Sequence, residues 1–358
     1  MDRAMIAVAS EAHYIMGPQV AELEDRLAGY VGVRHCLTCA NGTDALTLAL
    51  KAWGIGPGDA VFVPDFTFFS SAEVVALEGA SPVFVDVEAA TFNIDAESLE
   101  AAVRAVLAEG TLTPRVVVAV DLFGLPANFP AVRAVADKYG LLILEDGAQG
   151  FGGSIGGRKS CSFGDISTTS FFPAKPLGCY GDGGAVFTDN DEWAALMASY
   201  RVHGKGADKY DNVRIGLNSR LDTLQAAILQ VKMDVFDEEV EKVNEAARRY
   251  TQSLGGRVEV PVIPEGFRSS WAQYTIRLRD REQRDSLQAT LKSSGIPSMV
   301  YYPKPMHAQT AFSAAAQPLP CEGFAATQLC ETVLSLPMHP YITEAEIATV
   351  CSFLVNAL

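Results

Sequence analysis

A lysine set among aromatic, proline and glycine residues is the first candidate for chemistry in this sequence. Lys175 lies in the run Ser170-Phe-Phe-Pro-Ala-Lys-Pro-Leu-Gly, which contains no other charged residue. A lysine held away from water loses part of its preference for the charged form, and a neutral amine can form a Schiff base with a carbonyl group. On this segment alone, a lysine that extends from a surface loop is an equally open interpretation.

An acidic residue 29 positions upstream favours the Schiff base. Asp146 ends the apolar run Leu142-Ile-Leu-Glu-Asp, and Gly147-Ala-Gln149 follows. Ligands of open α/β sheets lie beyond the carboxyl ends of the strands. An aspartate there can pair with a protonated pyridine nitrogen and keep a cofactor ring an electron sink. Taken alone, Asp146 could equally cap the following turn.

A polar turn supplies a candidate phosphate site. Asn41-Gly42-Thr43-Asp44 separates a strand-like stretch, 35–40, from a helix-forming stretch, 45–53. Free backbone N–H groups and the Thr43 hydroxyl could bind a phosphate at the start of that helix. An ordinary N-cap by Thr43 or Asp44 is the alternative, and one turn can do both.

These candidates require a sheet that places them together, and the chain alternates strand and helix signals in the way such a sheet needs. The expected strands are apolar over their whole length, so both of their faces should be buried. We therefore predict an α/β fold, a large domain with a mixed, mostly parallel sheet between helices. The expected strands are 35–40, 60–64, 83–87, 115–121, 141–146, 167–172 and 184–188, and the expected helices are 18–31, 45–53, 70–78, 95–108 and 130–139.

The second part of the chain has a different pattern. Residues 221–250 predict one long helix, straight or bent, that leads into a smaller α+β domain. The predicted division is a large domain over 1–235 and a smaller C-terminal domain over 236–358. In the smaller domain the expected strands are 272–279 and 297–302, and the expected helices are 283–294 and 344–358.

Composition excludes several classes of protein. The net charge of −15 argues against a nucleic-acid partner, because such binding needs clustered Lys and Arg. No apolar run approaches the length of a membrane span, so we expect no membrane association and a cytoplasmic enzyme. The seven cysteines predict reduced thiols, and Cys36 and Cys39 fit a buried strand better than a redox pair or half a zinc site. No metal site is expected. The glycines of 150–156 lack the spacing of a dinucleotide-binding loop.

Six motifs together resemble the DegT/StrS-type sugar-nucleotide aminotransferases, a branch of the fold-type-I pyridoxal-phosphate enzymes. The resemblance runs from about Gly17 to near the C-terminus. Within the family, the segments around Lys175 and Asn218 are most similar to enzymes that aminate UDP-2-acetamido-2-deoxy-3-oxo-glucuronate. The motifs are Asn41-Gly-Thr-Asp-Ala, Pro64-Asp-Phe-Thr-Phe, Glu145-Asp-Gly-Ala-Gln, Ser170-Phe-Phe-Pro-Ala-Lys, Gly181-Asp-Gly-Gly and Gly216-Leu-Asn-Ser-Arg-Leu-Asp.

The resemblance implies a role for each matching residue. Lys175 would hold pyridoxal 5'-phosphate as a Schiff base and then move the proton, and Asp146 would pair with the pyridine nitrogen. Gln149 would hydrogen-bond the ring hydroxyl, and Phe68 would stack on the ring. Asn218 would reach the phosphate in the neighbouring subunit, so the active sites of a homodimer would be shared. The residues expected to hold the phosphate within the subunit are Gly42, Thr43 and Ser170.

The substrate residues follow less directly. Arg220 is expected to meet a sugar carboxylate, because a planar guanidinium suits a bidentate contact. A structural ion pair of Arg220 with Asp222 is the alternative. Tyr301 and Tyr302 are expected to line the sugar site, although Tyr301 stands where relatives have histidine. The opening segment also departs from the family pattern, so no contact is assigned to it.

The predicted function is transamination of a UDP-linked keto sugar, with L-glutamate as amino donor, for O-antigen or other surface polysaccharide. A 4-keto-6-deoxy sugar nucleotide is the alternative substrate. Two other functions use the same fold. A pyridoxal-phosphate sugar dehydratase is disfavoured in its histidine form by Lys175, and a non-catalytic regulator is disfavoured by the set Lys175, Asp146 and Gln149.

Overall fold

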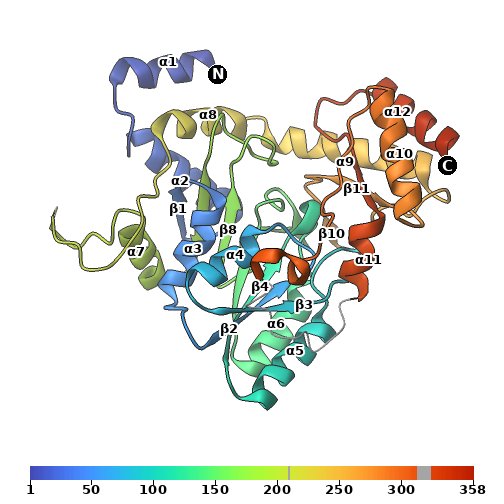
Figure 1. Ribbon diagram of the computed structural model, residues 1–358. Coiled ribbons are helices and arrows are strands. Elements are labelled where there is room, and N and C mark those ends of the chain that lie inside the picture. The colour runs from blue at the N-terminus through green and yellow to red at the C-terminus, as the bar shows by residue number, and fades with distance from the viewer. Residues whose placement is uncertain (209, 313–323) are drawn as a thin grey trace.

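The computed structural model describes residues 1–208, 210–312 and 324–358. Within them, seven strands form the central sheet (Figure 1). Strands β3, β2, β4, β5 and β8 run parallel, while β9 is antiparallel to both of its neighbours. In spatial order the strands are β1 (His35–Cys39), β9 (Gly184–Thr188), β8 (Ile166–Ser170), β5 (Leu142–Asp146), β4 (Thr113–Val120), β2 (Asp59–Pro64) and β3 (Ser81–Val85).

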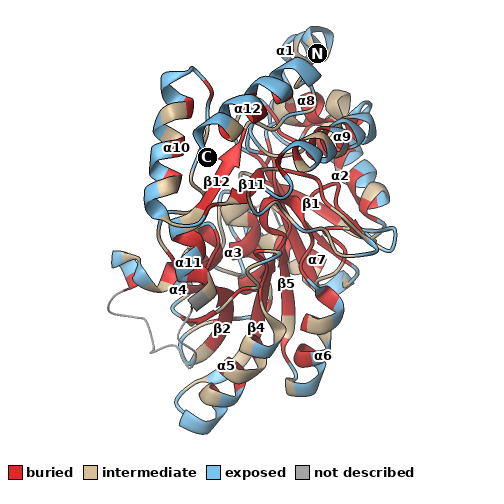
Figure 2. Cartoon of the chain, turned by 90° about the vertical axis from the view of Figure 1, so that its right-hand side faces the viewer, coloured by how far each residue is buried: buried red, intermediate tan, exposed pale blue. Residues whose placement is uncertain are grey.

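Helices cover both faces of this sheet, which confirms the α/β prediction (Figure 1). The strands form the buried centre of the molecule, and Val116, Val117 and Val118 of β4 are fully buried (Figure 2). Their unbroken apolar character is what a sheet covered on both faces requires. The covering helices are α2 (Pro18–Val31), α3 (Gly42–Ala52), α4 (Ser70–Leu77), α5 (Ala96–Glu109), α6 (Phe129–Tyr139), α7 (Asp191–Tyr200) and α8 (Thr223–Met233).

The remaining elements form the C-terminal part and two small additions to the main sheet. A second apolar cluster there joins α9, β11, α10, β12 and α12 around Tyr250 and Tyr274. These elements are α9 (Phe236–Leu254), β11 (Tyr274–Arg277), α10 (Arg281–Ser293), α11 (Phe324–Thr332), β12 (Val333–Leu336) and α12 (Glu344–Ala357). The small additions are the sheet of β6 (Ser154–Ile155), β7 (Arg158–Lys159) and β10 (Phe267–Arg268), and the 3₁₀ turns η1 (Leu122–Gly124), η2 (Met306–Ala308) and η3 (Thr310–Phe312).

Two expectations are wrong in detail, and one helix was not predicted. The predicted long helix is two helices, α8 and α9, because the chain turns at Asp234 and Val235. The predicted strand 297–302 is irregular, with one isolated bridge between Met299 and Ser335. A helix that the sequence did not predict, α1 (Asp2–Glu11), lies beside α8 with Val8 as its buried contact (Figure 1).

Candidate active site

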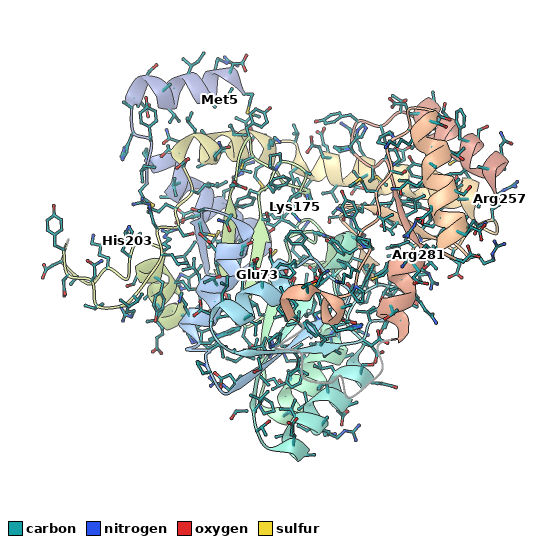
Figure 3. The ribbon with its side chains drawn as sticks, viewed as in Figure 1. Met5, Glu73, Lys175, His203, Arg257 and Arg281 are labelled. Carbon is teal, nitrogen blue, oxygen red and sulfur yellow. The ribbon has the colours of Figure 1, made fainter. Side chains whose placement is uncertain are left out.

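Lys175 lies in the loop that joins β8 to β9, near the centre of the molecule (Figure 3). Its backbone N–H donates to the carbonyl oxygen of Phe172 at 2.8 Å, and Leu177 and Cys179 anchor the loop in the core. Burial lowers the pKa of the Lys175 amine, and the charge of Asp146 opposes that shift. Among the described residues, no ion-pair partner contacts this amine. A lysine in this environment gives up its proton more readily than one in water, as a nucleophilic amine must.

Asp146 ends β5, at the edge of the sheet where the parallel strands finish. Its Oδ2 accepts from the Ser71 hydroxyl at 2.8 Å, and its Oδ1 accepts from the Ala148 N–H at 3.2 Å. Burial raises the pKa of Asp146, while these two hydrogen bonds and the charge of Lys175 lower it. The carboxylate thus has donors and a cation nearby, but no close ion pair that would neutralise it. Ser71 was not predicted from the sequence, since a serine in the first turn of a helix has no distinctive signal.

The polar turn before α3 has the geometry of an anion cradle. Asn41 is the N-cap, and its Oδ1 accepts from the Asp44 N–H at 2.8 Å; the cap is therefore neither Thr43 nor Asp44. The first N–H groups of a helix have no partner within it, so those of Gly42 and Thr43 are available to a ligand. The Thr43 hydroxyl lies 3.0 Å from that of Ser70.

Ser170 completes this cradle from β8. A Cβ atom on Gly42 would lie 2.8 Å from the Ser170 Cβ, so only glycine allows the helix start to approach the strand this closely. The cradle therefore combines backbone N–H groups with the hydroxyls of Thr43, Ser70 and Ser170. Three of the residues predicted to bind phosphate, Gly42, Thr43 and Ser170, lie together here.

Gln149 and Tyr302 form a second group. The Gln149 Oε1 accepts from the Phe123 N–H at 2.6 Å, and its Nε2 donates to the Tyr302 hydroxyl at 3.1 Å. One Nε2 hydrogen is left over, because the amide carries two. The exposed ring of Phe68 lies 6.1 Å from that of Tyr302. Burial raises the pKa of the Tyr302 phenol, so this group stays protonated.

Asn218 and Arg220 stand on either side of the buried Ser219. They follow an arm, made of the described residues 203–208 and 210–217, that projects from the molecule, where His203 is labelled in Figure 3. Asn218 is exposed and Arg220 half-buried. The alternative pairing of Arg220 with Asp222 is absent from the described structure, and Asp222 instead stands at the start of α8.

Ser219 fixes the base of that arm. It is fully buried, its backbone N–H donates to the Arg201 carbonyl oxygen at 2.9 Å, and its hydroxyl accepts from the Ala40 N–H at 3.1 Å. The arm is thereby tied to the start of the phosphate cradle of its own chain. Tyr301 meets Tyr302 with ring centroids 5.8 Å apart.

A cleft of about 570 Å³ opens beside Lys175, between its loop and the C-terminal part of the chain. Its walls are mostly apolar, with Phe236, Trp271 and Tyr341 among them, and Lys232 and His339 add polar groups. A partly apolar hollow with a few polar groups, lined by a lysine of lowered pKa, is typical of an enzyme site. The arrangement suits a phosphorylated pyridine aldehyde: a reactive amine, an acid for the ring nitrogen and a cradle for the phosphate.

Comparison with known proteins agrees with this geometry. Residues 1–355 match the DegT/DnrJ/EryC1/StrS aminotransferase family. The chain belongs to this family. The resemblance drawn from the motifs is therefore confirmed, and so is the cofactor, pyridoxal 5'-phosphate.

Three relatives are similar along nearly the whole chain. The UDP-2-acetamido-2-deoxy-3-oxo-D-glucuronate aminotransferase of Pseudomonas aeruginosa is 46% identical over 359 residues, covering 99% of this chain and 95% of that protein. The UDP-N-acetyl-3-dehydro-alpha-D-glucosamine 3-aminotransferase of Acidithiobacillus ferrooxidans is 41% identical, covering 98% and 92%. The crystal structure of an aminotransferase of this family from Brucella abortus has a TM-score of 0.95 and 49% identity, covering 99% and 94%.

This chain is thus a pyridoxal-phosphate-dependent sugar-nucleotide aminotransferase. In the ranges that the structure describes, no helix is both long and apolar enough to span a bilayer. In those same ranges, no group of three or more His, Cys, Asp or Glu residues could hold a metal ion. Cys36 and Cys39 are buried, unpaired thiols in or beside β1, as expected for a strand.

Proposed function

We propose that the enzyme aminates the keto carbon of a UDP-linked uronate, with UDP-2-acetamido-2-deoxy-3-oxo-D-glucuronate as the substrate and L-glutamate as the amino donor. One observation carries the choice of a uronate: Arg220 offers a guanidinium that no described carboxylate neutralises, next to the firmly held Ser219. A free guanidinium at the end of a fixed segment suits a bidentate contact with a carboxylate. The name of the Pseudomonas aeruginosa relative supports the same class of substrate.

The roles of the cofactor-binding residues are part of this proposal. Lys175 would hold the cofactor, and its buried amine, which gives up its proton readily, could take up and return a proton at the reacting carbon. Asp146, held by Ser71, would pair with the protonated pyridine nitrogen of the cofactor. When bound, the cofactor supplies an electron sink for the carbanion that proton removal leaves. Gly42, Thr43 and Ser170 hold the phosphate, Gln149 the ring hydroxyl and Phe68 the ring face.

We propose that the working enzyme is a cytoplasmic homodimer that serves surface polysaccharide synthesis. Among the described residues, no hydrogen bond or ion pair joins Asn218 or Arg220 to Lys175 or Asp146, and Asn218 is exposed, which supports a role in the site of a second copy. The domain division proposed above, 1–235 and 236–358, places the cleft at the junction of the two parts. Tyr301 and Tyr302 are proposed to line the sugar subsite.

A mixing experiment tests the shared site. Lys175→Ala and Asn218→Ala homodimers are each inactive or weak. After dissociation and random reassociation, half of the dimers are mixed, and each mixed dimer has one site with both residues intact. We expect roughly one quarter of wild-type activity to return, as random assortment of a twofold dimer requires. If Asn218 served its own chain, no site would be intact and activity would not return.

A substrate pair tests the uronate. The enzyme is assayed with the 3-oxo uronate and with a neutral UDP-4-keto-6-deoxy sugar. For Arg220→Ala we expect kcat/KM for the uronate to fall by about 100-fold, since a charged pair is lost, while activity on the neutral sugar stays low and unchanged. The control is Arg34→Ala, which removes an arginine far from the cleft. An Arg220→Ala variant with wild-type preference for the uronate contradicts the proposed substrate.

A further inference from the structure

A buried aspartate that has no proposed role in catalysis forms hydrogen bonds to the segment that follows Tyr302. Asp65 directly follows β2 and is fully buried. Its Oδ1 accepts from the His307 N–H at 2.8 Å, and its Oδ2 lies 2.6 Å from the His307 ring Nδ1. Its backbone carbonyl oxygen also accepts from the Met306 N–H at 2.8 Å. One residue at the end of a sheet strand thus makes three hydrogen bonds to two consecutive residues that lie about 240 positions away along the chain.

The chain between this contact and Tyr302 is short and stiff. Only four residues separate Tyr302 from His307, and two of them are Pro303 and Pro305, whose rings fix their own φ angles. Met306 is buried in the core of the large domain. A displacement of the His307 backbone should therefore also displace Tyr302.

The same aspartate also borders the aromatic side of the site. Phe66, the next residue in the chain, packs edge-on against the Tyr302 ring with centroids 6.1 Å apart. Phe68 lies at the same distance on the exposed side. Asp65 therefore links two segments. One carries Phe66 and Phe68, and the other carries Tyr302.

We propose that Asp65 and His307 are positioning residues that hold the Tyr302 hydroxyl where it orients the Gln149 amide toward the cofactor ring. The inference rests on the contact proposed above between Gln149 and the ring hydroxyl. Tyr302 accepts one Nε2 hydrogen and the Phe123 N–H fixes the position of Oε1, so in the planar amide the second Nε2 hydrogen has a single direction left. If Tyr302 moves away, the amide loses the partner that fixes this direction.

The pair differs from an ordinary surface contact. The Asp65 carboxyl group has no access to solvent, whereas the His307 side chain is 32% exposed. Burial raises the pKa of Asp65, and the hydrogen bonds and charge of His307 lower it again. Removing the imidazole leaves a buried carboxylate short of a donor, which costs stability as well as position. A conservative variant must therefore accompany the truncation.

The test uses apo and reconstituted enzyme. His307→Ala should bind pyridoxal phosphate about 10-fold more weakly in equilibrium dialysis, which corresponds to about 1.4 kcal/mol. It should also shift the visible band of the lysine-bound cofactor and lower kcat more than it changes KM for glutamate. His307→Asn keeps a donor close to the place of Nδ1 and should recover most of the affinity and the band.

A second histidine provides the matched control. His35 contacts Asp191 at 2.7 Å, at the opposite edge of the sheet. The His35 side chain is 35% exposed, much like that of His307, but Asp191 is 73% exposed, unlike the buried Asp65. His35→Ala should leave cofactor affinity and band unchanged. A His307→Ala enzyme that unfolds at a lower temperature but keeps the wild-type band and affinity would show a purely structural contact and overturn the inference.

Two further variants separate this inference from the proposed function. In a Tyr302→Phe background, His307→Ala should have little additional effect, because both act through one hydroxyl. If Gln149→Ala leaves the band unchanged, the cofactor contact of Gln149 is wrong, and the inference falls with it. If Gln149→Ala changes the band and His307→Ala does not, only the positioning role is wrong.

Discussion

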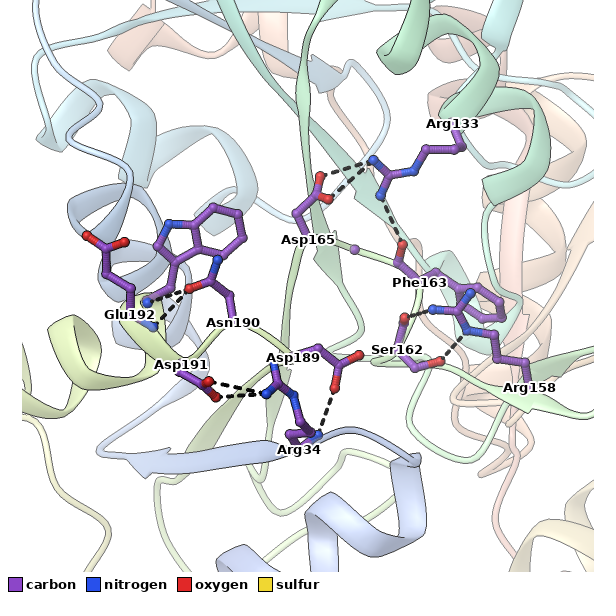
Figure 4. Close-up of a pocket in the computed structure, with 12 residues that line it drawn as sticks. Arg34, Arg133, Arg158, Ser162, Phe163, Asp165, Asp189, Asn190, Asp191 and Glu192 are labelled. Atoms are coloured by element: carbon purple, nitrogen blue, oxygen red, sulfur yellow. Dashed lines mark hydrogen bonds and ion pairs between the residues drawn. The ribbon is translucent and has the colours of Figure 1, made fainter.

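Two hollows of similar size contain charged side chains at opposite edges of the central sheet. They differ in whether those side chains have ion-pair partners. The first, about 620 Å³, lies where β8 begins and β9 ends, and Arg34, Arg133 and Arg158 line it (Figure 4). Each has a partner. Arg34 lies 3.0 Å from Asp191, Arg133 lies 3.2 Å from Asp165, and Arg158 bonds the Ser162 hydroxyl and carbonyl oxygen.

The second hollow, about 570 Å³, opens beside Lys175. Lys175, on its wall, has no ion-pair partner among the described residues. Asp146, whose charge acts on Lys175, is held by a hydroxyl and a backbone N–H rather than by a cation. Both pKa values are shifted by burial. Charge that is already neutralised stabilises a surface slightly, whereas desolvated charge without a close partner is available for a ligand. The number of charged residues around a hollow therefore says little about catalysis, and their pairing says more.

The largest contrast is expected between Lys175→Ala and Arg34→Ala. Loss of the amine removes both the covalent attachment and the proton carrier, so kcat should fall roughly 10⁴-fold. The visible band of the bound cofactor should disappear. Arg34→Ala in the other hollow should change neither. A Lys175→Ala enzyme with a normal band after dialysis would mean that another amine holds the cofactor.

Asp146→Asn should reduce activity and raise stability at the same time. The amide keeps the shape but not the charge, so we expect kcat to fall about 10²- to 10³-fold. The apo protein should gain on the order of 1 kcal/mol at neutral pH, because a buried charge is removed.

The stability gain should depend on pH with a defined sign. Burial raises the folded-state pKa of Asp146, so its ionised form costs stability above that pKa. Below the carboxyl pKa of the unfolded chain the group is neutral in both states, and wild type and variant should unfold at the same temperature. Calorimetry of both apo proteins across this range checks the claim. A gap that widens as the pH falls would contradict it.

The sequence predicts the second hollow better than the details around it. Local sequence predicts the positions of Lys175, Asp146 and Gly42, because buried parallel strands end at one edge of the sheet and a turn with Gly precedes a helix. Each of these residues carries its signal within a few neighbours. Ser71 and His307 carry none, because their partners Asp146 and Asp65 are 75 and 242 positions away.

The errors in secondary structure have a similar cause. Leu229, Met233, Phe236 and Val240 keep helical spacing across the turn between α8 and α9, so the pattern predicts one helix. The turn redirects the chain from contact with α2 to contact with α12, and only tertiary packing decides it. The stretch 297–302 is rich in residues that favour strands, yet only Met299 forms a bridge there, with Ser335.

A pair of serines gives a smaller effect of the same kind. Ser71 donates to Asp146 Oδ2 at 2.8 Å, and the Ser162 hydroxyl accepts from Arg158 Nε at 3.0 Å. Ser71→Ala should lower kcat about 10-fold, since a hydrogen bond to a charged group is worth roughly 1.5 kcal/mol. Ser162→Ala should leave kcat unchanged. Equal losses from both would mean that activity follows general stability rather than the site.

The smallest effect should come from Arg133→Ala in the paired hollow. Arg133 donates to both carboxylate oxygens of Asp165, at 3.2 and 3.3 Å, yet its side chain is 35% exposed. A half-exposed ion pair contributes about 0–1 kcal/mol, so denaturant unfolding should shift by no more than that, and kcat/KM should not change. Asp165 also accepts from the Ile143 N–H at 2.7 Å, so its carboxylate keeps a donor when Arg133 is gone. A large loss of activity from Arg133→Ala would mean that the paired hollow communicates with the catalytic one through β5, and the distinction between the two hollows would fail.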